Sequence, residues 1–326
     1  MSYAQAADEA ALRTVQPLNE QWKFLRSDGL TEDAALAAAA TDWQTVTLPH
    51  TWNAVDAASV DLPGSYDRGV GWYRLELAAP SAGARHWLEI GAASLVADVW
   101  LNGRKLGQHK GGFTAFRFDV TDTLVPGVAN VLLVKVDNSA PRDEDDLTAI
   151  APLGGDFNVS GGLYRHVALI STAAAAHFDL GDSGGPGVYA STSAIQDGTA
   201  TIDVRSKVTN AGAAATNAIV RLSLIDAAGA VAASGEQSVE LALGQIAEAD
   251  LPLQVPSARL WRGTADPHLY RLVAELVGPD GTALDRVDQS FGIRSMTFDP
   301  NEGFFLNGEP LRLRGVAIHQ DFQGRG

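Results

Sequence analysis

Apolar and polar residues alternate with a period of two through most of this 326-residue chain, and this pattern constrains its fold more than any other feature. Residues 72–77, 131–136 and 201–205 alternate in this way, as strands with one buried face do. Only residues 31–40 suggest a helix, with Thr31 as its N-cap. Glycine, proline, asparagine and aspartate separate the runs. The pattern therefore predicts an all-β sandwich protein.

Short turn sequences indicate where strands reverse direction. Asn-Gly occurs at 102–103 and at 307–308, and Asp-Gly occurs at 280–281. These pairs tolerate positive φ at both central positions, so each predicts a tight hairpin. The composition then changes near residues 173–176. The part before is rich in tryptophan and phenylalanine, whereas residues 177–292 are dominated by Val, Ile, Leu, Ala and Thr. The strand spacing after the change is that of an immunoglobulin-like sandwich.

Charge and cysteine content exclude several classes of partner and site. Lys and Arg number 24 against 39 Asp and Glu, for a net charge of −15. We therefore expect no nucleic-acid and no membrane partner, because both bind basic surfaces. The chain has no cysteine, which excludes disulfides and thiolate metal sites. His50 and His109 lack metal-ligand spacing, and no glycine-rich phosphate loop precedes a helix, so we predict no metal site and no cofactor.

A glycine-flanked loop at residues 154–162 carries Asp156 and Asn158 and leads into a predicted strand at 163–170. On local sequence Asp156 is either a turn carboxylate that accepts backbone N–H groups or an exposed functional carboxylate. The acidic cluster at 143–146 lacks the ligand spacing and the central glycine of an EF-hand loop, so we interpret it as a solvated loop.

Several stretches, taken in order, resemble the N-terminal region of the family 2 glycoside hydrolases, the β-galactosidase and β-glucuronidase group. They are the Pro-His-Thr-Trp stretch at 49–52, residues 68–74, the Asn-Gly hairpin, residues 107–119 and residues 156–165. Residues 305–319 resemble the entry to that family's catalytic barrel. The resemblance covers nearly the whole chain. Each motif is weak alone, whereas their order and intervals are specific.

The resemblance implies an all-β architecture in three parts. These are a jelly-roll, galactose-binding-like sandwich at 1–176, an immunoglobulin-like β-sandwich at 177–297, and the start of a (β/α)8 barrel at 298–326. A barrel needs about 200 residues or more, and the chain ends shortly after its predicted first strand at 311–318, so we expect none to form. We also predict that residues 298–313 dock on the second sandwich or on a neighbouring molecule, and that residues 319–326 are mobile or held only by packing contacts.

The family relationship also implies a reaction. Retaining hydrolysis of a glycoside needs two carboxyl groups about 5 Å apart, and in this family both are glutamates on later barrel strands. We therefore expect no catalytic residue in this chain. The parent is expected to be a retaining exo-β-glycosidase, with β-galactosidase placed ahead of β-glucuronidase. The chain would supply scaffold and substrate-site completion and would itself be inactive.

The resemblance assigns substrate contacts to Asp156, His319 and Asp321. The matching aspartate of the family binds hydroxyls of the terminal sugar, which suits a carboxylate because it accepts charge-assisted hydrogen bonds. The matching histidine follows the first barrel strand. Trp52 is a candidate exposed aromatic, while the other tryptophans are expected in cores. For Arg165 we expect a structural ion pair.

Two other classes stay open, a stand-alone carbohydrate-binding module and a purely structural pair of β domains. Sugar binding by this chain alone would favour the module. The expected partners are a terminal β-linked sugar, the barrel of the same protein and, for the parent, further copies in a homo-oligomer. Ala4-Gln5-Ala6 resembles a signal-peptidase site. Periplasmic or extracellular and cytoplasmic locations are therefore both open.

Overall fold

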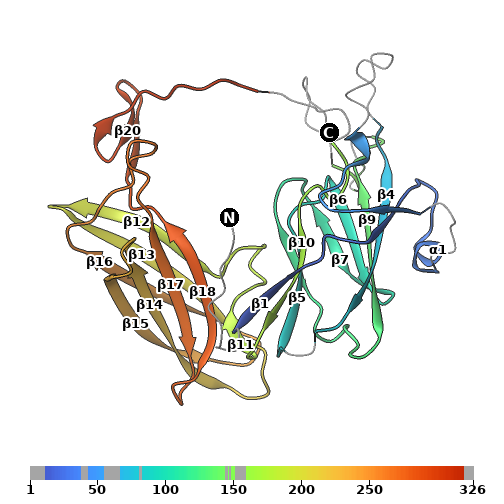
Figure 1. Ribbon diagram of the computed structural model, residues 1–326, viewed down its shortest axis with the longest axis horizontal. Coiled ribbons are helices and arrows are strands. Elements are labelled where there is room, and N and C mark those ends of the chain that lie inside the picture. Colours follow the sequence, from blue (N-terminus) through green and yellow to red (C-terminus); the bar gives the residue numbers. More distant parts are fainter. Residues whose placement is uncertain are drawn as a thin grey trace. The chain divides into compact units, whose positions relative to one another are not determined.

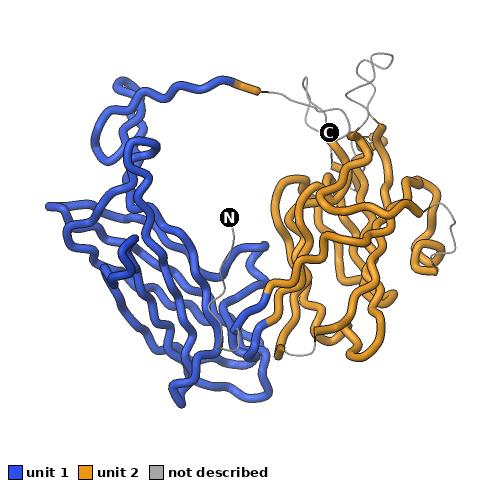
Figure 2. Tube along the Cα trace, in the orientation of Figure 1, with its two compact units in different colours: residues 1–14, 172–316 blue, residues 15–171, 317–326 orange. Residues whose placement is uncertain are grey.

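The computed structural model describes residues 12–37, 43–54, 67–80, 83–143, 146, 148–150 and 159–318. The chain divides into two compact units (Figure 2). We call residues 15–171, grouped with 317–326, the jelly-roll unit, and residues 172–316, grouped with 1–14, the immunoglobulin-like unit. The three-part domain division given above stays a prediction. Among the described residues, no helix has the length and apolar character needed to cross a membrane.

The jelly-roll unit contains two β-sheets (Figure 1). One sheet has six strands in the order β3-β2-β4-β9-β6-β7, and the other has four in the order β1-β10-β5-β8. Every pairing in the six-stranded sheet is antiparallel. The strands are β1 (Arg13–Pro17), β2 (Trp22–Arg26), β3 (Gln44–Val46), β4 (Val70–Ala78), β5 (Arg85–Ile90), β6 (Val96–Leu101), β7 (Arg104–Lys110), β8 (Phe116–Asp119), β9 (Ala129–Asp137) and β10 (Val167–Thr172).

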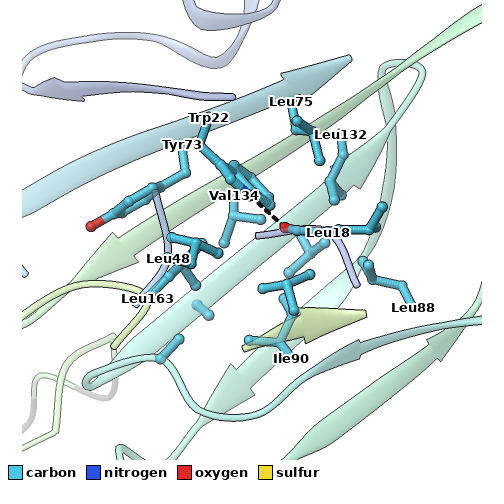
Figure 3. Packing of buried hydrophobic residues seen from close by; sticks show 14 of the residues in the cluster. Leu18, Trp22, Leu48, Tyr73, Leu75, Leu88, Ile90, Leu132, Val134 and Leu163 are labelled. Atoms are coloured by element: carbon cyan, nitrogen blue, oxygen red, sulfur yellow. Dashed lines mark hydrogen bonds between the residues drawn. The ribbon is translucent and has the colours of Figure 1, made fainter. Parts of the chain in front are cut away.

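The core of this unit consists of apolar side chains from both sheets (Figure 3). Trp22, Tyr73 and Leu163 are completely buried in it. The indole Nε1 of Trp22 donates to the carbonyl oxygen of Leu18 at 2.6 Å, so the largest core side chain leaves no polar atom unsatisfied. Trp72 and Trp100 are also buried, at 3% and 4% exposure, which confirms the prediction that these tryptophans belong to cores.

The predicted helix is confirmed in its central part. α1 (Glu32–Ala37) begins where the Thr31 hydroxyl accepts the N–H of Ala34 at 3.4 Å and the Thr31 carbonyl accepts that of Ala35 at 3.0 Å. Residues 38–40 lie outside the described residues. Ala35 packs against a second, smaller apolar cluster with members on β4, β6 and β9. The helix therefore covers apolar surface that the main core leaves outside.

The predicted hairpins are confirmed. Asn102 and Gly103 have φ of 52° and 77° between β6 and β7, and Asn307 and Gly308 have φ of 54° and 77°. Asn and Gly tolerate this left-handed conformation, which matches the twist of a two-residue hairpin. Asp280-Gly281 lies in the hairpin connection between β17 and β18, residues 278–282, where Gly281 has a φ of 85°.

The immunoglobulin-like unit is a second antiparallel sandwich. One sheet has the order β11-β13-β12 with β16 also paired to β13, and the other has the order β15-β14-β17-β18. Its core includes Phe178, Ile202 and Leu222, each at 0% exposure. The strands are β11 (Ala176–Phe178), β12 (Val188–Gln196), β13 (Thr199–Asn210), β14 (Thr216–Ile225), β15 (Val231–Leu241), β16 (Ile246–Val255), β17 (Tyr270–Val277) and β18 (Ala283–Phe291).

A buried carboxylate, Asp285, is fully satisfied within this unit. It is 0% exposed and accepts from Arg13 Nε at 3.1 Å and from the backbone N–H groups of Phe178 and Arg286 at 2.9 Å each. The guanidinium also forms an ion pair with the second carboxylate oxygen. A buried charge of this kind is tolerated because it is paired and hydrogen-bonded.

The last described part forms a small three-stranded sheet of β19 (Met296–Asp299), β20 (Gly303–Leu306) and β21 (Glu309–Pro310). Asn307 attaches it to the immunoglobulin-like unit, because its Oδ1 accepts the N–H of Ser295 and its Nδ2 donates to Trp261 O, both at 3.0 Å. The predicted docking is confirmed for this turn. Phe298, Leu311 and Leu313 do not dock on the second sandwich, since their exposures are 73%, 44% and 65%, and docking of these residues on a neighbouring molecule stays a prediction.

The strand predicted at residues 311–318 is wrong. These residues form no regular element and pair with no strand. A strand needs a neighbour for its N–H and C=O groups, and within the part of the chain that the structure describes only the Leu311 N–H of this stretch donates to a backbone carbonyl, Phe304 O at 2.8 Å. Val316 and Ile318 are accordingly exposed, at 84% and 66%.

The contrast between the hydrogen-bonded small sheet and the irregular residues 311–318 predicts a sharp boundary in amide hydrogen exchange. The Asn307 and Leu311 amides, which donate to Ser295 O and Phe304 O, should exchange slowly, and amides 313–318 should exchange near the rate of an unstructured chain. Asn307→Ala should remove the protection of the small sheet and leave that of β13 unchanged. Strong protection across 313–318 in dilute solution would contradict this assignment.

His50 lies in the aromatic part of the jelly-roll core. Its ring centroid is 4.6 Å from that of Phe24, and its Nδ1 is 2.8 Å from the Tyr73 hydroxyl oxygen. A neutral imidazole can accept the Tyr73 O–H at this nitrogen. Burial lowers the pKa of His50 to about 4, and burial raises the pKa of the Tyr73 hydroxyl. The folded unit therefore holds both groups in their neutral forms.

The lowered pKa of His50 predicts acid sensitivity of the jelly-roll unit. An unfolded histidine titrates near 6.5, so below that pH the unfolded state binds the proton more readily than the folded state. The free energy of unfolding should fall from about pH 6.5 toward pH 4, by at most about 3 kcal/mol for this residue. Urea unfolding between pH 7 and pH 4 measures the change, and His50→Gln should reduce the pH dependence. An identical pH dependence in the variant would contradict the assignment.

Candidate functional site

The three predicted substrate contacts Asp156, His319 and Asp321 lie outside the described residues, as does Asn158. The structure describes the chain on the C-terminal side of Asp156, from residue 159 onward, and the segments that contact it. Five short segments and Asn138 are joined by hydrogen bonds or close packing, and we call this group the loop end. The segments are residues 48–54, 67–69, 94–95, 111–113 and 159–164.

Backbone hydrogen bonds fix the chain that follows Asp156. The N–H of His50 donates to Leu163 O at 2.9 Å, and the N–H of Ser94 donates to Gly162 O at 3.2 Å. Gly162 has a φ of 129°, and an added Cβ would lie 2.5 Å from His50 O. Only glycine fits such a position. The Gly161-Gly162 pair therefore allows the backbone at residues 161–162 to pack directly against residues 48–54.

Two buried amide side chains complete these connections. Asn53 and Asn138 are both 0% exposed. Asn138 accepts the N–H of Gly69 at 2.9 Å and donates to Val159 O at 3.0 Å. Asn53 accepts the N–H of Gly161 at 2.7 Å and donates to Asp67 O at 2.8 Å. Sequence reasoning missed both residues, because a lone asparagine in a polar stretch is typical of a turn.

The prediction that Trp52 is an exposed aromatic is wrong. Its ring stacks on Phe24 with centroids 6.1 Å apart, and the Arg26 guanidinium carbon lies 5.5 Å from its centroid. A Cβ at Gly161 would come within 2.0 Å of Trp52 Cζ2, so the ring also lies directly on the backbone. Trp52 is therefore a packing element of the loop end, half-buried, and not a free stacking surface.

Arg26 holds the chain at residues 67–70. Its Nη2 donates to Asp67 Oδ1 at 2.8 Å and to Arg68 O at 2.9 Å, and its Nη1 donates to Val70 O and to Asp28 at 2.7 Å each. The N–H of Val70, followed by the Arg26 contact, lowers the pKa of Asp28. The N–H donors of the Arg26 guanidinium thus bond to carboxylate and carbonyl oxygens of the protein itself.

The exposed aromatic side chain among the described residues of the jelly-roll unit is Phe113, at 55% exposure. Its loop is tied down by a hydrogen bond from the Tyr164 hydroxyl to Gly112 O and by Arg165 Nη1, which donates to Phe113 O at 3.1 Å. Among the described residues, Arg165 therefore contacts a backbone carbonyl and also lies over the Tyr164 ring, with its guanidinium carbon 5.6 Å from the ring centroid, and the expected ion pair stays a prediction.

The chemistry of the described loop end is that of a rigid frame. Its buried amides Asn53 and Asn138 bond to each other and to its backbone, and His50 bonds to the buried Tyr73 hydroxyl of β4. Within the described ranges, no group of three or more His, Asp or Glu side chains could hold a metal ion.

Comparison with known proteins identifies both units. Residues 67–159 match the model described as the glycosyl hydrolase 2 galactose-binding domain-like, and residues 187–294 match that of glycosyl hydrolases family 2. A β-glucuronidase of Bacteroides fragilis is 35% identical over 306 residues, which cover 93% of this chain and 41% of that protein. A β-galactosidase of Bacteroides ovatus is 30% identical over 310 residues, covering 93% and 34%.

Comparison with solved structures indicates the same family. The crystal structure of a Bacteroides uniformis β-glucuronidase superposes with a TM-score of 0.85 at 34% identity, covering 96% of this chain and 36% of that one. The chain thus spans less than half the length of the relatives that it matches. The first unit is galactose-binding-like and the second is the immunoglobulin-like sandwich of that family, so the chain belongs to glycoside hydrolase family 2.

Proposed function

We propose that this chain is the N-terminal, non-catalytic part of a retaining exo-β-glycosidase that removes terminal β-linked sugars. The observation that carries the proposal is the match of nearly the whole chain to less than half of the length of the glycosidase relatives described above. In this proposal the two catalytic carboxyl groups belong to the part of those relatives that the chain does not match. The two sandwiches supply scaffold and complete the substrate site.

Asp156 is the proposed sugar contact of the jelly-roll unit. Three residues beyond it, Val159 O is held by Asn138, and Gly161 is held by Asn53. A carboxylate can accept charge-assisted hydrogen bonds from adjacent sugar hydroxyls. His319 and Asp321 are proposed as further contacts to the same sugar.

The sugar is proposed to be a β-galactoside or a β-glucuronide, and the relatives support the glucuronide as well as the galactoside. Both names occur among them, with β-glucuronidase the more frequent. A uronate carboxylate needs a cationic or amide partner. The donors of Arg26, Asn53 and Asn138 already bond to protein groups. The cationic or amide partner of a uronate carboxylate would therefore be another residue.

A carbohydrate-binding module that acts on its own is the second candidate. The galactose-binding-like match of residues 67–159 favours it. Isothermal titration of this chain with galactose, glucuronic acid and their β-linked disaccharides separates the two proposals, because a module binds sugar without any catalytic part.

The first expected result is catalytic silence of the chain. Incubated at high concentration with nitrophenyl β-galactoside and nitrophenyl β-glucuronide, it should release no nitrophenol, because hydrolysis needs a pair of carboxyl groups across the scissile bond. Turnover that persists through successive purification steps, at constant specific activity, would contradict the proposal.

The second expected result concerns Asp156→Asn in the complete protein. Loss of a charge-assisted hydrogen bond should lower kcat/KM by an amount equivalent to about 1.5–3 kcal/mol, or roughly 10- to 150-fold. The urea midpoint should hardly change. Asp197→Asn is the matched control, since Asp197 is an exposed turn carboxylate between β12 and β13 with a φ of 49° that asparagine also adopts. Unaltered kinetics of Asp156→Asn would refute the assigned role.

A further inference from the structure

Exposed apolar side chains gather on the small sheet of β19, β20 and β21 and on the residues that follow it. Five large apolar side chains are exposed within residues 296–316, all in the immunoglobulin-like unit. No other stretch of this length among the described residues exposes as many. The five are Met296, Phe298, Leu311, Leu313 and Val316, at 55%, 73%, 44%, 65% and 84% exposure. Apolar surface concentrated in this way is typical of a contact site.

One face of the small sheet carries three apolar side chains. Phe298 and Phe304 are opposite each other in the register of β19 and β20, and their ring centroids are 5.0 Å apart. Opposite residues of an antiparallel pair share a face, as do residues two apart along a strand. Met296 therefore lies on the same face, and we call these three side chains the apolar face. Figure 1 shows β20 at one end of the immunoglobulin-like sandwich.

Polar contacts, and not the apolar face, attach the small sheet to the immunoglobulin-like unit. The turn residue Asn307 bonds to the backbone of Ser295 and Trp261. Arg262 Nη1 forms an ion pair with Glu309 Oε1 at 3.3 Å. The apolar face takes no part in these contacts, and two of its three members are more than half exposed. The small sheet is therefore fixed in place while its apolar face stays open.

The residues after the small sheet indicate what covers this surface. Leu311 and Leu313 alternate with Arg312 and Arg314, which is the period of a strand. Residues 311–316 nevertheless pair with no strand of the described chain. Because a strand needs a neighbour, this pattern favours a neighbour in a part of the protein outside the described residues. The relatives have room for such a part, since this chain covers less than half of their length.

We propose that the apolar face, together with Leu311, Leu313 and Val316, is the surface on which the catalytic part of the complete protein docks. The small sheet then joins two parts of that protein. Its turn is bonded to the immunoglobulin-like unit, and its apolar face packs on the catalytic part, where burial of aromatic and aliphatic side chains stabilises the contact. This inference rests on the proposed function, in which a catalytic part accompanies this chain.

Oxidation of Met296 tests the proposal without any substitution. The chain contains two methionines, Met1 and Met296, which peptide mass spectrometry separates. Hydrogen peroxide transfers an oxygen atom to an accessible thioether and forms the sulfoxide. Met296 should be oxidised about tenfold or more slowly in the complete protein than in the chain of residues 1–326, because the docked part covers the sulfur. Equal rates in the two proteins would overturn the inference.

The dependence on concentration distinguishes the catalytic part from a second copy of this chain. We expect the oxidation rate of Met296 in the chain of residues 1–326 to be the same in dilute and in concentrated solution. If Met296 becomes protected as the concentration of this chain rises, and the complete protein adds no further protection, a second copy covers the apolar face and the proposal is wrong.

Phe298→Ser and Val231→Ser form a matched pair of variants. Both side chains are exposed, at 73% and 59%, so neither substitution should change the urea midpoint of the chain of residues 1–326. In the complete protein, Phe298→Ser should remove most of the protection of Met296. Val231→Ser, on β15 and outside residues 296–316, should leave that protection unchanged. Loss of protection in both variants, or in neither, would contradict the assigned surface.

Assay of the complete protein with nitrophenyl β-galactoside and nitrophenyl β-glucuronide separates this inference from the proposed function. If the complete protein hydrolyses either substrate while Met296 stays as reactive as in the chain of residues 1–326, the proposed function stands and the docking surface is wrong. If the complete protein hydrolyses no β-glycoside, the proposed function is itself wrong and the docking inference fails with it.

Discussion

The hydrogen bonds of the Asn138 side chain join two parts of the jelly-roll unit that its β-sheets cannot join. The side chain accepts from Gly69 and donates to Val159 and Asn53. Buried backbone N–H and C=O groups must find partners, and at the loop end the amides replace the missing strand pairing. The arrangement at the loop end therefore depends on a small number of polar contacts, whereas the sandwich depends on a large apolar core.

The polar contacts of the loop end and the apolar core of the sandwich respond differently to substitution, and the family to which the chain belongs has members with different sugar names. A sandwich core tolerates conservative substitution as long as volume and pattern are kept. The loop end is less tolerant, because glycine at 161 and 162 is required by Trp52 and by a φ of 129°. Relatives named β-galactosidase and β-glucuronidase share the fold with this chain. A common frame that carries different sugar contacts would explain how one architecture serves both.

The sequence was sufficient to predict the strands at 72–77, 131–136 and 201–205, the hairpins at Asn102 and Asn307, the capped helix after Thr31 and the fold class, because each depends on local periodicity or turn chemistry. The loop end was not predictable in the same way. Trp52 was expected to be exposed, yet it packs on Gly161, 109 residues away, and no local pattern indicates such a contact. Likewise, residues 311–318 have strand composition but no partner strand.

The central claim is that the loop end forms part of the sugar site of the complete protein, and photochemical cross-linking tests it most directly. A β-glycoside with a diazirine on its terminal sugar would be irradiated on the complete protein, and the adducts would be located by peptide mass spectrometry. The account predicts adducts in the peptide that contains Asp156, which excess unlabelled glycoside suppresses. Suppressible adducts confined to other parts of the protein would contradict it.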